Sequence, residues 1–377
     1  MDFDFSWLLW GLPIAFVLGW LASRLDLRQL RIENRQAPKA YFKGLNFLLN
    51  EQQDQAIDAF IEAVQNDPDT SELHFALGNL FRRRGEYERA VRVHEHLLSR
   101  GDLSQADRHR SQHALALDFL KAGLLDRAEE ALRKLEGTAY EAQALLALLA
   151  IYERTRDWPQ ASEIARKLDA SGQGSFGGRL AHYLCEQAAA AAPPRAEELL
   201  RQAMEVAPGA PRPAIELAAL QRRVGDAAGA FQTLMGLAES APAALPLVAA
   251  PLAEAALACG ERQRAFDKLR ASYEHLPSLD LLDALVALEP DAQAARAWYV
   301  KHLEREPSLV AASKWLAQEK LEHEQYHAAV QGALDHAAKP LTRYRCAACG
   351  FEAKQHFWQC PGCQAWDSYP ARRVEEL

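Results

Sequence analysis

The chain opens with an uninterrupted run of apolar residues. Residues 5–23 read FSWLLWGLPIAFVLGWLAS and contain no charge. A helix rises about 1.5 Å per residue, so this run spans close to the roughly 30 Å hydrocarbon layer of a bilayer. Trp7 and Trp20 lie near its two ends, where aromatic rings favour the membrane interface. Residues 1–23 are therefore predicted to form a transmembrane anchor, kinked at Pro13.

The flanking charges predict how this anchor is oriented. Asp2 and Asp4 precede it, whereas six basic and two acidic residues lie between Arg24 and Lys43. A cleaved signal peptide would need a basic leader, and a buried core helix would normally show a polar face. Because basic residues stay on the cytoplasmic side, the bulk of the chain is expected in the cytoplasm. Residues 24–38 are expected to form a basic juxtamembrane linker helix, either on anionic headgroups or in solvent.

From residue 39 to residue 338 the apolar and small residues recur with a period near 34. Gly44 to Gly78 and Ala56 to Ala90 are each 34 residues apart. Gly and Ala let neighbouring helix backbones approach closely, and Pro ends a second helix. The matching positions of the seven clear copies are Gly44, Phe47, Ala56, Phe60, Ala63 and Pro68; Leu77, Gly78, Phe81, Gly85, Tyr87 and Ala90; Leu115, Phe119, Gly123 and Ala128; Leu148, Tyr152, Trp158 and Ala161; Ala196, Leu200, Ala203 and Pro208; Leu217, Gly225 and Ala230; Leu252, Gly260 and Ala265.

This spacing is typical of tetratricopeptide repeats and predicts an all-α solenoid. One or two degenerate copies follow, around residues 280–307 and 315–334, and residues 188–194 and 242–251 loosen the pattern. An irregular helical bundle with coincidental alanine spacing is the alternative. A solenoid offers a long concave binding surface but few convergent catalytic groups, so we expect no enzyme activity.

The glycine-rich stretch at residues 172–178, GQGSFGG, could be mistaken for a phosphate-binding loop. It follows a predicted helix, and no Lys-Ser or Lys-Thr comes after it. We therefore interpret it as a hinge or a plain loop between repeats.

Composition and charge narrow the choice of partners. The chain is 49% hydrophobic and 25% charged, which excludes a disordered chain, and only 8% aromatic. Its net charge is -8, from 43 basic and 51 acidic residues, and the acidic excess lies between the basic linker and the tail. A general nucleic-acid-binding surface is therefore disfavoured, and basic or mixed protein segments are the expected partners.

Four of the six cysteines fall in the tail, over residues 343–370, which we expect to form a separate small domain. Cys346 and Cys349 form one Cys-x2-Cys turn, and Cys360 and Cys363 form another. Each turn directs two sulfurs at one ion, and two turns complete a tetrahedron that suits iron or zinc. Two disulfides are disfavoured in a reducing cytoplasm.

The residues around these cysteines suggest how the small domain is held. His356 lies between the two turns, and with four thiolates available it is predicted not to be a ligand. Phe351, Phe357, Trp358 and Trp366 give the domain an apolar face that it cannot bury alone, so we expect it to dock on the solenoid.

The other cysteines and histidines show no ligand spacing. Cys185 and Cys259 fall among Ala and Leu on predicted helices and are interpreted as packed thiols. Most histidines are expected on the surface or in the groove, including the pairs His94/His96 and His109/His113.

The tail sequences Cys-Ala-Ala-Cys-Gly-Phe and Cys-Pro-Gly-Cys resemble the metal-binding turns of rubredoxin, with a shorter separation. That resemblance favours one iron ion, and zinc-ribbon chemistry would satisfy the same ligands. With the anchor and the repeats, the chain resembles the lipopolysaccharide assembly protein B family of Gram-negative bacteria over essentially its whole length. The most specific part is the tail, through Cys346, Cys349, Cys360, Cys363, Phe351, Trp358 and Trp366.

The resemblance implies a single-pass adaptor of the bacterial inner membrane, with a periplasmic N-terminus and its bulk on the cytoplasmic side. Such an adaptor regulates lipopolysaccharide synthesis by promoting degradation of the deacetylase that commits precursors to lipid A. The degrading enzyme is a membrane-anchored AAA protease. The family is also expected to gather other synthesis proteins at the membrane. A second copy of the chain, forming a homodimer, is a further expected partner.

Two other classes of function remain open from the sequence. In the first, a rubredoxin-like iron site transfers electrons and the repeats serve as a docking surface. The chain has no flavin or nicotinamide motif to serve such a site, and exchange of iron for redox-silent zinc would discriminate. In the second, a zinc ribbon binds nucleic acid, which the acidic charge and the anchor disfavour.

Overall fold

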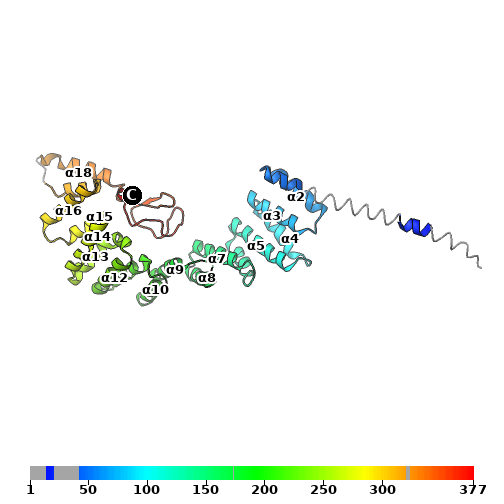
Figure 1. Ribbon diagram of the computed structural model, residues 1–377, viewed down its shortest axis with the longest axis horizontal. Helices are drawn as coiled ribbons and strands as arrows, with labels where there is room; N and C mark the ends of the chain where they lie inside the picture. The colour runs from blue at the N-terminus through cyan, green and yellow to red at the C-terminus, as the bar shows by residue number, and fades with distance from the viewer. Residues whose placement is uncertain (1–13, 21–41, 173, 320–322) are drawn as a thin grey trace, which may run out of the picture. The chain divides into compact units, whose positions relative to one another are not determined.

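The computed structural model describes residues 14–20, 42–172, 174–319 and 323–377 (Figure 1). Within the predicted anchor, residues 14–20 are helical, and Phe16 and Leu18 are exposed. The remainder of the anchor and the basic linker predicted for residues 24–38 lie outside the described residues. The chain divides into two compact units, residues 1–154 and 155–377, which are described separately.

The first unit is a series of helices joined by short turns, in which each helix from α2 to α5 packs on the next. Helices α3 and α5, the first helices of successive repeats, also contact each other. Gly85 and Gly123 directly follow these helices with φ of 84° and 77°, so both first helices end on a left-handed residue that glycine adopts without strain. The elements are residues 42–49, α2 (Gln53–Asn66), α3 (Ser71–Arg84), α4 (Tyr87–Ser99), α5 (Gln105–Ala122), α6 (Leu125–Arg133) and α7 (Glu141–Thr155).

The second unit continues the same arrangement and ends in a small two-stranded module. Its elements are α8 (Trp158–Ala170), α9 (Gly177–Ala189), α10 (Pro193–Val206), α11 (Pro211–Arg223), α12 (Ala227–Ser240), the 3₁₀ helix η1 (Pro242–Ala244), α13 (Leu245–Cys259), α14 (Arg262–His275), α15 (Leu279–Leu288), α16 (Ala292–Arg305), α17 (Leu309–Leu316), α18 (Glu324–Ala338), β1 (Tyr344–Arg345), β2 (Glu352–Ala353) and the 3₁₀ helix η2 (Val374–Glu376). The degenerate copies correspond to α15 with α16 and α17 with α18.

The predicted repeat alanines form the contacts between helices. Six of them are completely buried, namely Ala56, Ala90, Ala128, Ala161, Ala230 and Ala265. A larger side chain at any of these sites would push two helices apart, which is why the period appears in the sequence as small residues. The prediction of an all-α tetratricopeptide-type solenoid is confirmed.

Proline residues lie in both stretches where the repeat pattern loosens, residues 188–194 and 242–251. Pro193 begins α10, and Pro251 lies inside α13. The described residues of the glycine-rich stretch follow α8, and its last two, Gly177 and Gly178, begin α9, which agrees with a connection between repeats.

Among the described residues, Pro242–Cys259 is long and apolar enough to cross a membrane by length and composition. In the structure it is a repeat helix, with Leu245, Val248 and Leu252 completely buried against the helices around it.

The expectation that His94 lies at the surface or in the groove is wrong. Its side chain is completely buried, and its Nδ1 lies 2.5 Å from Oδ2 of the equally buried Asp118. Arg82 Nη1 donates to the other oxygen of Asp118 at 2.8 Å. Since Asp118 belongs to the next repeat, the spacing of the histidines alone could not reveal this network.

Three more histidines are buried, namely His74, His182 and His302, whereas His96 is exposed. Cys185 is completely buried, as predicted for a packed thiol, and burial raises the pKa of its thiol.

The ring of His94 occupies the space that a side chain at position 78 would need. A Cβ at Gly78 would lie 2.5 Å from His94 Nε2, and His94 has no exposed space into which to move. We predict that Gly78→Ala lowers the free energy of unfolding by roughly 1–3 kcal/mol, as overpacking does.

Gly236→Ala provides the matched control, because nothing lies within 4 Å of a Cβ at that helical position. It should leave stability unchanged or raise it by up to about 1 kcal/mol. Urea unfolding followed by circular dichroism measures both variants. Equal effects of the two substitutions would show that His94 does not limit the space at Gly78.

Candidate metal centre

The four tail cysteines lie on two turns of the same construction. In the first turn, Cys346 N donates to Phe351 O at 2.9 Å and Gly350 N donates to Cys346 O at 2.8 Å. In the second, Cys360 N donates to Ala365 O and Gln364 N donates to Cys360 O at the same two distances, 2.9 and 2.8 Å. Gly350 and Gln364 both have positive φ, 78° and 62°. The two turns therefore present their sulfurs in matching ways.

The strands hold the first turn in place. β1 pairs antiparallel with β2, with Tyr344 opposite Ala353 and Arg345 opposite Glu352. The second turn is closed by a single bridge between Gln359 and Trp366. Both Cys-x2-Cys turns thus sit at the closed ends of short hairpins.

The sulfurs converge at distances that suit one tetrahedral ion. All four Sγ atoms lie within 4.8 Å of one another. Cys346 Sγ lies 3.9 Å from Cys363 Sγ, and Cys349 Sγ lies 3.7 Å from Cys360 Sγ. An ion bound at about 2.3 Å from each sulfur would separate the sulfurs by about 3.8 Å. The donor set therefore fits zinc or iron, and a four-cysteine metal-binding site is present.

The electrostatics of the four thiols favour a bound cation. Burial opposes ionisation of Cys346, but its hydrogen bonds with the Ser368 hydroxyl and with the N–H groups of Cys349 and Ala348 outweigh it and lower its pKa to about 6. For Cys349, the N–H of Phe351 lowers the pKa, but burial and the neighbouring sulfurs raise it by more, to about 12. Sulfurs this close cannot all ionise unless a positive charge lies between them.

His356 takes no part in this cluster. Its Nε2 lies 3.0 Å from Tyr369 O, and its ring packs edge-on against Trp358, with centroids 4.7 Å apart. Burial lowers the pKa of His356, so the ring is neutral at pH 7 and serves the packing of the module.

One face of the module docks on α8 and α9 through Trp366. The indole stacks on His182 at a centroid distance of 4.6 Å and meets Tyr183 and Trp158 edge-on at 6.1 and 6.3 Å. Trp358 also contacts His182. The predicted docking on the solenoid is present, but Phe351 does not share in it, because its side chain remains 43% exposed.

A hydrogen-bonded histidine reinforces this contact. His182 Nε2 lies 2.9 Å from Asp367 Oδ2, and His182 Nδ1 lies 3.4 Å from Arg212 Nη1. Arg212 can only donate, so Nδ1 accepts and Nε2–H donates to Asp367. Arg212 is itself held by Glu186 at 2.8 Å and Glu216 at 2.6 Å. His182 and Arg212 are buried in this network, which fixes the tautomer of His182 and the position of Asp367.

A second contact joins the module to α15. Arg373 makes a bidentate ion pair with Asp280, at 2.9 and 2.7 Å, and its guanidinium lies 4.1 Å from the centre of the Tyr344 ring. The planar fork of arginine matches a carboxylate in this geometry. Within the second unit, the tail is therefore attached to the repeat helices both at α9 and at α15.

Sequence reasoning found the sulfurs but missed the residues that attach the module. His182, Arg212 and Asp280 look like ordinary helix residues, and only the fold brings them to the tail. One signal was available in the sequence: Pro-Ser-Leu occurs at residues 277–279 and again at 307–309. Both copies receive side chains from the tail, as described below.

Comparison with known protein families agrees with the geometry of the tail. A family profile described as "Rubredoxin metal binding domain" matches residues 344–369. A tetratricopeptide repeat protein of known structure from Parabacteroides merdae aligns with a TM-score of 0.36 at 15% identity, covering 67% of this chain and 99% of its own.

Two curated relatives match nearly the full length. Lipopolysaccharide assembly protein B of Escherichia coli strain K12 is 30% identical over 97% of this chain and 98% of its own. The protein of the same name from Haemophilus influenzae is 29% identical over 95% of this chain and 96% of its own. The chain belongs to the lipopolysaccharide assembly protein B family.

Proposed function

We propose that this protein is an inner-membrane adaptor that regulates lipopolysaccharide biosynthesis. The near full-length similarity to proteins named lipopolysaccharide assembly protein B carries this proposal. In it, the adaptor promotes degradation of the lipid A-committing deacetylase by a membrane AAA protease and assembles other synthesis proteins at the membrane. The protein itself performs no catalysis.

The proposed mechanism assigns one task to each part of the chain. Residues 1–23 span the membrane and place the adaptor beside the protease, with residues 24–38 as the basic linker on the cytoplasmic side. The repeats over residues 39–338 bind the deacetylase and raise its effective concentration near the protease. The tail over residues 343–370 docks on the repeats and fixes their curvature.

The proposed cofactor is one iron ion, with zinc as the alternative occupant, held by Cys346, Cys349, Cys360 and Cys363. The resemblance of the two turns to those of rubredoxin is the reason for preferring iron, while the matched profile and the sulfur separations suit both ions. A bound ion would supply the positive charge that lets all four thiols ionise. Asp367 and Trp366, which lie just beyond the second turn, then remain in position against α9.

Removal of two ligands tests the metal's structural role. We expect Cys346→Ser with Cys349→Ser to abolish metal binding and to lengthen the half-life of the deacetylase in cells several-fold, because the module can no longer hold its turns together. Metal analysis and a translation-arrest chase measure both effects. Cys259→Ser, which alters a thiol outside the module, should change neither; normal turnover and fold in the double variant would remove the role given to the metal.

Deletion of residues 1–23 tests the proposed anchor. The shortened chain should leave the membrane fraction and lose its copurification with the protease, because only the anchor brings the two together in the bilayer. Crosslinking and pull-down from solubilised inner membranes, with and without these residues, measure this. Continued membrane association of the shortened chain would contradict the single-anchor proposal.

Trp366→Ala tests whether docking, rather than metal binding alone, matters. Loss of an indole packed on α9 should weaken docking by roughly 2–4 kcal/mol and speed hydrogen exchange around Tyr183, with the metal retained. Phe351→Ala is the matched control, since this aromatic side chain of the same module is exposed. Slow exchange at Tyr183 in the Trp366 variant would show that the indole does not hold the module.

A further inference from the structure

Two successive repeats of the second unit begin with the same three residues. Pro-Ser-Leu precedes the body of α15 at residues 277–279 and that of α17 at residues 307–309. In both, the serine hydroxyl oxygen caps the helix: Ser278 Oγ accepts from Leu281 N at 3.2 Å, and Ser308 Oγ accepts from Ala311 N at 2.9 Å. The two turns thus expose the same next N–H group, that of the leucine.

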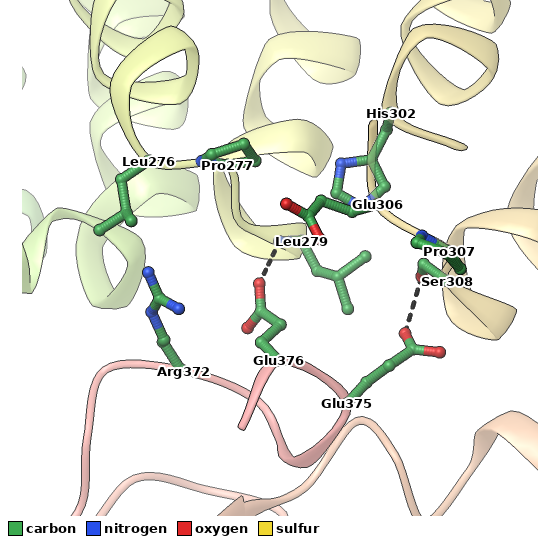
Figure 2. A pocket seen from close by; sticks show the side chains of 10 residues that line it. All are labelled: Leu276, Pro277, Leu279, His302, Glu306, Pro307, Ser308, Arg372, Glu375 and Glu376. Atoms are coloured by element: carbon green, nitrogen blue, oxygen red, sulfur yellow. Dashed lines mark hydrogen bonds between the residues drawn. The ribbon is translucent and has the colours of Figure 1, made fainter. Parts of the chain in front are cut away.

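Each of these N–H groups binds a carboxylate from the C-terminal segment. Leu279 N donates to Glu376 Oε1 at 2.7 Å (Figure 2). Leu309 N donates to Glu375 Oε1 at 2.6 Å. The Ser308 hydroxyl also donates to Glu375 Oε2 at 2.7 Å. Two adjacent glutamates therefore occupy equivalent positions on two repeats, where the positive ends of the helices favour negative charge.

A third contact adds a requirement for a basic residue. Asp280, in the first turn of α15, binds Arg373 through both of its oxygens. The surface therefore matches a basic residue followed, two residues later, by two adjacent carboxylates. We call residues 277–280 and 307–310 the Pro-Ser-Leu surface.

The C-terminal segment does not fill this surface completely. A pocket of about 140 Å³ lies beneath it, with walls that include Leu276, His302, Glu306 and Arg372 (Figure 2). Leu276 is 48% exposed, although it lies directly beside the first turn. The segment is held mainly by hydrogen bonds and ion pairs at its edges, and such contacts can be exchanged for equivalent ones from another peptide.

We infer that the Pro-Ser-Leu surface is a peptide-binding site that residues 373–376 occupy in cis as an autoinhibitory segment. Its external partner is an acidic peptide with the pattern basic-x-acidic-acidic. The charge complementarity seen with Arg373, Glu375 and Glu376 identifies this chemistry. The inference does not depend on the proposed role in lipopolysaccharide synthesis. Because a tethered segment acts at an effective concentration in the millimolar range, the partner must itself be concentrated near the adaptor.

The test uses the full chain with Arg373→Ala, Glu375→Ala and Glu376→Ala, which frees Asp280 as well as the two leucine N–H groups, and a fluorescent peptide with the sequence ARRVEEL as the probe. Fluorescence anisotropy should show saturable binding to the variant and at least about tenfold weaker apparent binding to the natural chain, in which the cis segment competes. The peptide ARRVAAL should not bind the variant. Adding Asp280→Asn to the variant should weaken binding of ARRVEEL, because the partner of its arginine is lost.

Hydrogen exchange on the natural chain provides the second measurement. It tests the proposal even if the variant does not fold. An excess of ARRVEEL, but not of ARRVAAL, should speed exchange at residues 373–377 by displacing them. The proposal is overturned if a folded, metal-loaded variant binds ARRVEEL no better than the natural chain does, or binds ARRVAAL equally well. It is likewise overturned if excess ARRVEEL leaves exchange of the natural segment unchanged.

Discussion

The convergence of four sulfurs is the constraint on which the C-terminal module depends. The module has only two short strands and a few buried aromatic rings, which is too little apolar surface to fold a domain of this size alone. Four thiols within 4.8 Å of one another repel when ionised, so their arrangement requires a cation. An ion bound between the sulfurs would remove this repulsion and fix both turns, and with them the side chains that reach the solenoid.

Those side chains connect repeats that are not neighbours in the solenoid. In a stack of helical pairs, each pair contacts only its neighbours, and small changes of angle accumulate along the stack. Within the second unit, Asp367 reaches His182 on α9, while Arg373 and Glu376 reach the start of α15. Repeats distant in sequence are thereby attached to one rigid body. A binding surface with defined curvature loses less conformational entropy when a partner binds.

The sequence predicts the features that depend on residues close together in the chain or repeated at a fixed period. Alanines and glycines at helix crossings, such as Ala90 and Gly78, predicted the solenoid because backbone approach demands small residues at a fixed period. The two Cys-x2-Cys turns predicted the metal site because adjacent sulfurs must share one turn. The attachment of the module was predicted only as a consequence of its apolar residues, and Phe351 was wrongly included. The buried positions of His94 and His182 could not be predicted, because Asp118 and Asp367 approach them only in the folded chain.

Hydrogen exchange before and after removal of the metal from the full chain tests the central claim most directly. If the ion holds the module and the module holds the repeats, chelation should speed exchange together around Tyr183 in α9 and Leu279 in α15, while α3 and α4 of the first unit keep their protection. Faster exchange confined to residues 344–369, with α9 and α15 unchanged, would contradict the claim that the metal site organises the solenoid.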